Sequence, residues 1–253
     1  MAAVGNLINR HQPHVVAFQE VTADLEQLLR RGGWWKEYTM SPHAASSYYT
    51  LLGVRKQTAA RVEYTRMPFG NSEMGRDLLC TEFVAGGAAR VCVATSHLES
   101  FINPGRTSSK ERLEQMRVAT ASLERRQGQQ GVDIIFGGDM NWDDAEEGKL
   151  SARLPGGWVD AWAALHGEQG GFTYDGVANP MLNNRIRKRL DRFVCRLHSF
   201  GLAKVELLGT EAVPGKTYRR EYKGGVKLVP VVPSDHFGLL LTLRPRKVDD
   251  GEA

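Results

Sequence analysis

Short apolar runs that end in polar residues recur along this chain, and they predict strands whose ends carry functional groups. The apolar run 132–136 is followed by two glycines and then by Asp139 and Asn141. Because side chains on a strand alternate between its two faces, we expect Asp139 and Asn141 on the same side. Another apolar run begins directly after Asp235 and His236. The pattern therefore predicts two polar clusters at strand ends.

The spacing of apolar residues predicts many strands and few helices. Strands are expected at 14–18, 48–55, 77–84, 90–95, 132–136, 189–195, 205–208 and 236–243. Helices are expected at 4–11, 25–31 and 109–126. In the last of these, Ser108 and Glu111 have the spacing of a capping box. One face of the same helix is expected to carry Leu113, Met116, Thr120 and Leu123.

Many strands with a few amphipathic helices favour an α/β architecture, with two mixed sheets packed face to face and helices on the outside. The polar strand ends would then meet at one rim. We expect this convergence for Glu20, His97, Asp139, Asn141, Asp191, Asp235 and His236. Length and continuity predict one domain over residues 1–245 and a disordered tail over 246–253.

The composition is that of an ordinary soluble domain, since 42% of the 253 residues are hydrophobic and 25% are charged. No apolar stretch approaches the ~18–20 residues that span a bilayer, and no signal peptide is recognisable. We expect a soluble intracellular protein with no membrane partner. Cys80, Cys92 and Cys195 lack metal-ligand spacing and are expected to be buried, reduced thiols.

Basic residues are concentrated in two stretches, 185–192 and 216–227, although the formal net charge is only +4. Such clusters fit a polyanionic partner. They also fit solvated loops, and the sequence leaves both interpretations open. Three further polar residues also allow two interpretations each when they are taken singly. Glu20 could bind a metal or face solvent, His97 could be structural, and Asp191 could pair with a neighbouring arginine.

Taken together, the polar groups form an ordered set of motifs. These are Gln19-Glu20, Ser96-His97-Leu98-Glu99-Ser100, Gly138-Asp139-Met140-Asn141, Asp191-Arg192-Phe193 and Ser234-Asp235-His236. In this order and spacing they resemble the endonuclease/exonuclease/phosphatase superfamily, whose fold is the deoxyribonuclease I-like four-layer α/β sandwich of two mixed sheets flanked by helices. Within it, segments 74–80, 95–100 and 233–240 are most similar to the 5′-tyrosyl-DNA phosphodiesterases.

The resemblance implies a metal-dependent phosphodiesterase. Glu20 would bind Mg²⁺, with Mn²⁺ as a substitute, and Asp235 would assist through water. Asp139, held by Asn141, would orient and deprotonate the attacking water. These roles meet the needs of phosphodiester hydrolysis, which requires charge neutralisation and an in-line water.

The same resemblance implies the groups that contact the phosphate and the rest of the substrate. His236, oriented by Asp191, would donate to a non-bridging oxygen, and His97 with Ser100 would grip the same phosphate. Residues expected to contact the bases or the DNA backbone are Trp142, Phe172, Tyr174, Arg185, Arg187, Lys188 and Arg189. The implied partners are DNA with 5′-phosphotyrosyl ends, single-stranded near the end, and the topoisomerase peptide adduct. A nuclear monomer is expected, with the cytoplasm as a second location.

The chain departs from the family pattern in three places. A first strand with a Thr-Trp-Asn type motif has no counterpart in this sequence, so the fold is expected to lack that strand. Trp142-Asp143-Asp144 stands where an arginine usually follows the Asp-x-Asn pair, and the 211–232 loop is longer and more basic than expected. Two alternatives therefore remain, namely another phosphoesterase of the superfamily (apurinic endonuclease, deadenylase or inositol-phosphate phosphatase) and a truncated, non-catalytic DNA-binding form.

Overall fold

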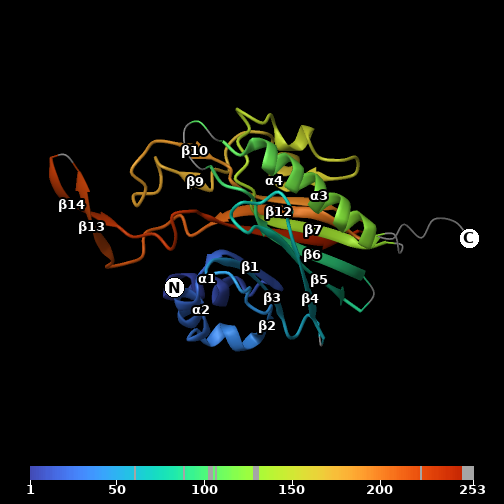
Figure 1. Cartoon of the computed structure of the whole chain (residues 1–253). Coiled ribbons are helices and arrows are strands. Elements are labelled where there is room, and N and C mark those ends of the chain that lie inside the picture. Colours follow the sequence, from blue (N-terminus) through green and yellow to red (C-terminus); the bar gives the residue numbers. More distant parts are fainter. Residues whose placement is uncertain are drawn as a thin grey trace, which may run out of the picture.

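The computed structural model describes residues 1–59, 61–87, 89–101, 105, 107–127, 131–222 and 224–246. Its helices are α1 (Ala2–His11), α2 (Ala23–Arg30), α3 (Ser109–Gln127) and α4 (Ala161–His166), with 3₁₀ turns at Gly33–Glu37 and Leu150–Ala152. The helices lie outside two layers of strands, with α3 and α4 on one side and α1 and α2 on the other (Figure 1). The predicted four-layer α/β sandwich is therefore confirmed.

The main sheet has six strands in the order β4-β5-β6-β7-β11-β8. Their bounds are β4 (Glu63–Pro68), β5 (Asp77–Ala85), β6 (Ala89–His97), β7 (Asp133–Asp139), β11 (Asp191–Arg196) and β8 (Val159–Asp160). The pair β6 and β7 is parallel, and the other neighbours are antiparallel, so this sheet is mixed as predicted.

The second layer of strands consists of two antiparallel sheets. One has the order β1-β3-β2 and the other pairs β12 with β15. The bounds are β1 (Val15–Val21), β2 (Tyr38–Met40), β3 (Tyr49–Arg55), β12 (Phe200–Leu208) and β15 (Gly238–Pro245). The prediction of a second mixed sheet is wrong for the described residues, because every strand pair in this layer is antiparallel.

Two hydrophobic cores lie on opposite faces of the main sheet. One packs Met116 of α3 against Ile134 of β7, and the other joins Leu52 of β3 to Ile135 of β7. Successive strand residues point to opposite faces, so Ile134 and Ile135 serve different cores. A strand covered on both faces must be apolar at every position. This burial explains the continuous apolar run that precedes Asp139.

The predicted strands and helices are found within five residues of their expected bounds, the largest difference being the earlier start of β12, whereas shorter elements were missed. Two small hairpins, β9 (Tyr174–Asp175) with β10 (Arg187–Lys188) and β13 (Thr217–Tyr222) with β14 (Gly225–Pro230), were not expected. The edge strands β2, β4 and β8 and the helix α4 were also missed. The predicted 211–232 loop is therefore wrong, because it contains an ordered hairpin.

Two details predicted for α3 are wrong. Leu113 is 46% exposed and lies off the buried face, which is formed by Met116, Thr120 and Leu123. The Ser108 side chain is buried, and its hydroxyl has no hydrogen-bond partner among the described residues, so no capping box forms.

Other expectations concern the cysteines, the membrane and the tail. Cys80, Cys92 and Cys195 are free and buried, as predicted. Among the described residues, no helix has the length and apolar character that crossing a bilayer requires. The tail predicted from residue 246 lies outside the described residues except for Arg246, whose backbone N–H donates to Ser199 at 2.8 Å.

Gly138 permits the close approach of β6 and β7 beside the predicted site. It has a φ of 146°, and a Cβ there would lie 2.1 Å from the Ser96 carbonyl oxygen. We expect Gly138→Ala to force the two strands apart and to lower the free energy of unfolding by about 3 kcal/mol. A fall of about 10 °C in Tm, measured by calorimetry, would register this change.

The control for this substitution is Gly201→Ala, in strand β12. A Cβ at Gly201 has no atom within 4 Å, so the expected change lies within about 0.5 kcal/mol. Equal Tm values for the two variants would contradict the steric argument.

Candidate active site

Strand register brings three predicted site residues side by side at one end of the main sheet. His97, the last residue of β6, pairs with Asp139, the last residue of β7. Asp191, the first residue of β11, pairs with Asp139 from the other side. Paired residues on neighbouring strands point to the same face. An imidazole and two carboxylates, far apart in the sequence, therefore share one edge.

Asp139 is buried, and its partners fix its orientation. It is 5% exposed, its Oδ1 accepts the backbone N–H of Asn141 at 2.9 Å, and its Oδ2 lies 3.3 Å from His97 Nε2. Burial, together with the nearby Asp191 carboxylate, raises the pKa of Asp139 well above the ordinary aspartate value. A carboxylate with a raised pKa is suited to accept a proton near neutral pH.

His236 completes the cluster from the segment that precedes β15. Its Nδ1 lies 2.8 Å from Asp191 Oδ2, and the ring of Tyr174 packs edge-on against the imidazole with centroids 5.3 Å apart. Burial lowers the pKa of His236, but the hydrogen bond and the charge of Asp191 outweigh it and raise the pKa to about 9. The imidazole is therefore protonated at neutral pH and can donate from Nε2.

His97 is buried among three polar partners, Arg76, Asp139 and Tyr48. An Arg76 N–H donates to Nδ1 at 3.0 Å, so the neutral ring carries its hydrogen on Nε2, facing Asp139. Burial and the Arg76 charge lower the pKa of His97 to about 2. Both ring nitrogens are engaged and the residue is 3% exposed, yet His97 lines the pocket beside Arg76, so its predicted contact with a phosphate stays a prediction. Its contact with Asp139 also orients that carboxylate.

Glu20 lies in an irregular part of β1. The register of β1 against β3 shifts between Phe18 and Val21, and Glu20 has a φ of 58°. Such a β-bulge redirects a side chain, and a non-glycine residue with positive φ is energetically costly. The exposed carboxylate of Glu20 accepts the Tyr48 hydroxyl at 2.6 Å. The bulge thus turns Glu20 out of the strand and toward Tyr48.

A divalent cation fits the acidic groups at this edge. Glu20 and Asp235 are exposed, and neither forms an ion pair within the described part of the chain, so both keep free oxygen atoms. Ligand atoms of Asp139, Asp191 and His236 also lie within 4.8 Å of one another. Carboxylate oxygens are the ligands that Mg²⁺ and similar hard cations prefer. Asp191 and His236 bind each other, which leaves Glu20 and Asp235 as the freer ligands.

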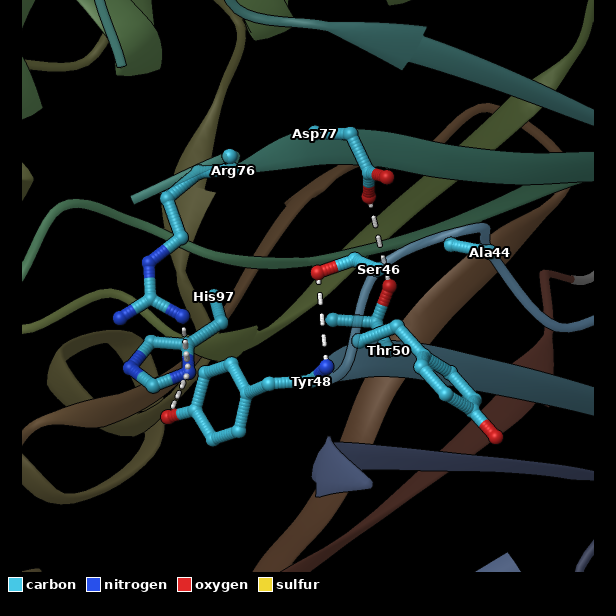
Figure 2. Close-up of a pocket in the computed structure, with 9 residues that line it drawn as sticks. Ala44, Ser46, Tyr48, Thr50, Arg76, Asp77 and His97 are labelled. Carbon is cyan, nitrogen blue, oxygen red and sulfur yellow. Dashed lines mark hydrogen bonds between the residues drawn. The ribbon is translucent and has the colours of Figure 1, made fainter. Parts of the chain in front are cut away.

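A pocket beside His97 contains two functional residues that the sequence did not reveal. Figure 2 shows the Arg76 guanidinium and the Tyr48 phenol, both directed at the His97 ring. Arg76 Cζ lies 5.1 Å from the centre of the Tyr48 ring, and a second guanidinium nitrogen lies 3.3 Å from Ser100 Oγ.

The charge of Arg76 is not neutralised within the described residues. The residue is 6% exposed, forms no ion pair there, and its Nε has no hydrogen-bond partner. An uncompensated buried cation is costly, and an anion at this point would stabilise it. The Met74-Gly75-Arg76-Asp77 stretch was a signal for this residue, but its role required the position of His97.

Comparison with models of protein families identifies the family of this chain. The model of the Endonuclease/Exonuclease/phosphatase family matches residues 1–236. The chain belongs to this family. The resemblance inferred from the motifs is therefore confirmed, and the converging edge lies within the matched residues.

Relatives of known name align with most of the chain. Tyrosyl-DNA phosphodiesterase 2 of Gallus gallus is 30% identical over 239 residues, covering 91% of this chain and 58% of the relative. The chain thus spans about three fifths of the length of such relatives. The crystal structure of D. rerio TDP2 complexed with single strand DNA product superposes with a TM-score of 0.75 at 26% identity, covering 96% and 90% of the two chains.

A more distant solved structure also has a similar fold. A mannosyl-6-phosphatase from Bacteroides thetaiotaomicron has a TM-score of 0.69 at 15% identity, covering 95% of this chain and 89% of its own. A likeness at this identity concerns the fold alone. Because one fold can host unrelated activities, this likeness does not indicate the substrate of the present chain.

Several residues predicted from the family pattern lie where a substrate could reach them. Tyr174 packs on His236, and Ser100 lies beside Arg76. Arg187 is part of the β9–β10 hairpin, where it pairs with Asp175 and its guanidinium lies 4.5 Å from the Phe172 ring centre.

Two other residues predicted to bind substrate are buried instead. Trp142 is 0% exposed and donates to the Gly148 carbonyl at 2.8 Å, so it is a core residue. Arg189 is 4% exposed and donates to Glu168 at 2.9 Å. Their predicted contacts with substrate are wrong, because neither presents a surface.

Asn141 is close to Asp139 for a different reason from the one predicted. It follows the end of β7 and has a φ of 46°, so strand alternation does not apply. Its backbone N–H holds Asp139, and its side-chain amide donates to the Leu98 carbonyl at 3.0 Å. The turn after β7, rather than its pleat, positions the pair.

Proposed function

We propose that this chain is a divalent-metal-dependent phosphodiesterase that hydrolyses the bond between a tyrosine and the 5′ phosphate of a DNA end. The observation that carries the proposal is the paired register of His97, Asp139 and Asp191, with His236 bound to Asp191. Relatives that bear the name of this activity cover most of the chain and support the choice of substrate.

Asp139 is the general base of the proposed reaction. Its raised pKa allows it to accept a proton from water near neutral pH, and His97 and the Asn141 backbone fix its orientation. The water then attacks phosphorus opposite the leaving tyrosine oxygen. His97 acts here as a positioning residue, because it contacts Asp139 and is shielded from solvent.

His236 and Arg76 neutralise the negative charge that grows on the phosphoryl oxygens. The protonated His236 can donate from Nε2 while Asp191 holds Nδ1, and Arg76, bound to His97 Nδ1, supplies a buried positive charge. Preorganised donors of this kind contribute strongly when water is excluded. Arg76 also supplies a cation of the kind that the sequence lacks after Asn141.

Glu20 and Asp235 would hold the divalent cation, and we propose Mg²⁺. A bound cation supplies charge stabilisation to a phosphoryl oxygen and to the leaving group. The tyrosine leaves as a phenoxide whose conjugate acid has a pKa of ~10, so it needs less assistance than an alkoxide. Removal of tyrosine from a topoisomerase adduct, as part of DNA repair in the nucleus, is the setting that this chemistry fits.

The protonated state of His236 gives the proposed reaction an alkaline limit. Since the pKa of His236 is raised to about 9 and the protonated form is the donor, kcat/KM should fall as the pH rises through about 9. Asp191→Asn removes the charge that raises this pKa, so the alkaline limb should move down by at least about one pH unit. A pH–rate profile of both proteins measures the shift, and an unmoved limb would refute the role of His236.

Substrate preference tests the proposed function directly. The test compares kcat/KM for a 5′-phosphotyrosyl oligonucleotide, an abasic duplex, poly(A) and an inositol polyphosphate, each with Mg²⁺. We expect the phosphotyrosyl substrate to lead by about 100-fold or more, a difference of about 3 kcal/mol in transition-state binding. A higher kcat/KM for any other member would assign the chain to that reaction instead.

A further inference from the structure

The net positive charge of this protein comes from the segment that forms the β13–β14 hairpin. Residues 216–230 contain five basic residues and one acidic residue, a net charge of +4 that equals the formal net charge of the whole chain. The rest of the sequence therefore contains equal numbers of acidic and basic residues. The hairpin extends from the body of the molecule on the side where β9 and β10 lie (Figure 1).

The register of the hairpin gives its two faces different characters. Arg220 pairs with Lys227 and Tyr222 pairs with Gly225, so these side chains share one face, which we call the aromatic face. Arg219 and Glu221 point to the other face, where their charges balance. Basic and aromatic side chains thus alternate along the aromatic face, whereas the other face carries one charge of each sign beside the exposed Val226 and Leu228.

No described residue neutralises the positive charges of the aromatic face. Arg220 donates to the Pro180 carbonyl at 3.1 Å and to the Asn183 side-chain oxygen, both of which are neutral. Lys227 is exposed and forms no ion pair with a described residue. Two like charges directly opposite each other on a ladder repel, which destabilises the hairpin unless an anion lies between them.

The base of the hairpin is fixed while its outer part is free. The Tyr218 hydroxyl donates to the Met181 carbonyl at 2.9 Å, and Val229 opposite Tyr218 is buried. Near the tip, by contrast, Tyr222 is 56% exposed. A two-stranded hairpin is marginally stable alone, so the anchored base keeps it in one orientation.

We propose that the aromatic face of the β13–β14 hairpin binds a single-stranded nucleic acid, with Arg220 and Lys227 contacting phosphates and Tyr222 stacking on a base. Alternating cations and exposed aromatic rings are the chemistry that recognises single strands. The identity of the strand rests on the proposed function, under which it would be the DNA strand that carries the reacting 5′ phosphate.

The hairpin is close enough to the active site to bind the same strand. His236 follows Pro230 by six positions, and six residues span at most ~20 Å. A stacked strand advances ~3.4 Å per nucleotide, so its path from the reacting phosphate to the base of the hairpin covers at most about six nucleotides. A strand of about 15 nucleotides is therefore long enough to reach Lys227 and Tyr222.

Equilibrium binding tests the proposal without requiring turnover. Fluorescence anisotropy with a labelled oligo(dT) of about 15 nucleotides gives Kd and its salt dependence for the full chain. We expect the double variant Tyr222→Ala/Lys227→Gln to bind about tenfold more weakly. The slope of log K against log salt should be about 0.7 shallower, because one phosphate contact is lost.

The matched control is Arg219→Gln, which removes one positive charge from the opposite face and should change Kd by less than about twofold. An unchanged Kd in the double variant, or equal weakening by Arg219→Gln, would overturn the proposal. A second test compares KM for phosphotyrosyl substrates of about 2 and about 15 nucleotides. The parent protein should have a lower KM for the longer substrate, and the double variant should show no such difference. Absence of turnover on both substrates would reject the proposed function, while the binding result would still decide the role of the hairpin.

Discussion

Asp139→Asn should lower kcat on a 5′-phosphotyrosyl oligonucleotide by about a thousandfold or more, because an amide cannot take the proton of the attacking water. The substitution keeps the shape of the side chain and can keep its hydrogen bond from the Asn141 backbone. Binding of the substrate should therefore change by less than about threefold. Steady-state kinetics together with anisotropy would separate the two quantities.

The stability of the same variant should depend less on pH than that of the parent protein. Burial and Asp191 raise the pKa of Asp139 in the folded state, so the ionised form is disfavoured there, and stability is lost as the pH rises above the unfolded value. An asparagine does not ionise, so this part of the pH dependence disappears. A flatter profile of Tm against pH together with lost turnover is the expected signature, and the exposed Asp24→Asn should show neither change. Near-normal turnover would remove Asp139 from the role of base.

Glu20→Gln should raise the Mg²⁺ concentration for half-maximal activity by about tenfold or more, because a charged ligand is replaced by a neutral one. The Tyr48 hydroxyl can still donate to the amide oxygen, so the local structure should persist. Activity measured over a Mg²⁺ titration would show the shift. Full chelation with EDTA should abolish turnover in both proteins.

Glu63→Gln provides the control for the metal titration, because Glu63 is an exposed glutamate on the β4 edge of the main sheet. It should leave the Mg²⁺ requirement unchanged. An identical titration for Glu20→Gln and the parent protein would show that Glu20 does not hold the metal, and the cluster of Asp139, Asp191 and His236 would become the alternative site.

Apolar runs and strand-end motifs were sufficient to predict the sandwich and the convergence of its polar groups. Strands covered on both faces must be apolar throughout, and this requirement made the strand that precedes Asp139 visible in the sequence. Its end residue then met His97 and Asp191 because the register of three strands aligned them. The site could be predicted as a set of residues, but not as a set of contacts.

The roles that the sequence missed depend on burial. Trp142 follows the Asp-x-Asn pair, yet it is buried in the core, and no local pattern distinguishes a core tryptophan from one that contacts substrate. Arg76 became a candidate only through its contacts with His97 and Ser100, which join segments about 20 residues apart in the sequence. The β13–β14 hairpin was missed because its strands are mostly exposed and lack a periodic apolar signal.

Tyrosine release from a 5′-phosphotyrosyl oligonucleotide tests the central claim most directly, since it requires the acids and imidazoles of this edge to act on one phosphate. We predict that the purified chain, given Mg²⁺, releases free tyrosine and leaves a 5′ phosphate on the DNA, and that EDTA stops the reaction. No tyrosine release at saturating Mg²⁺ and substrate would contradict it.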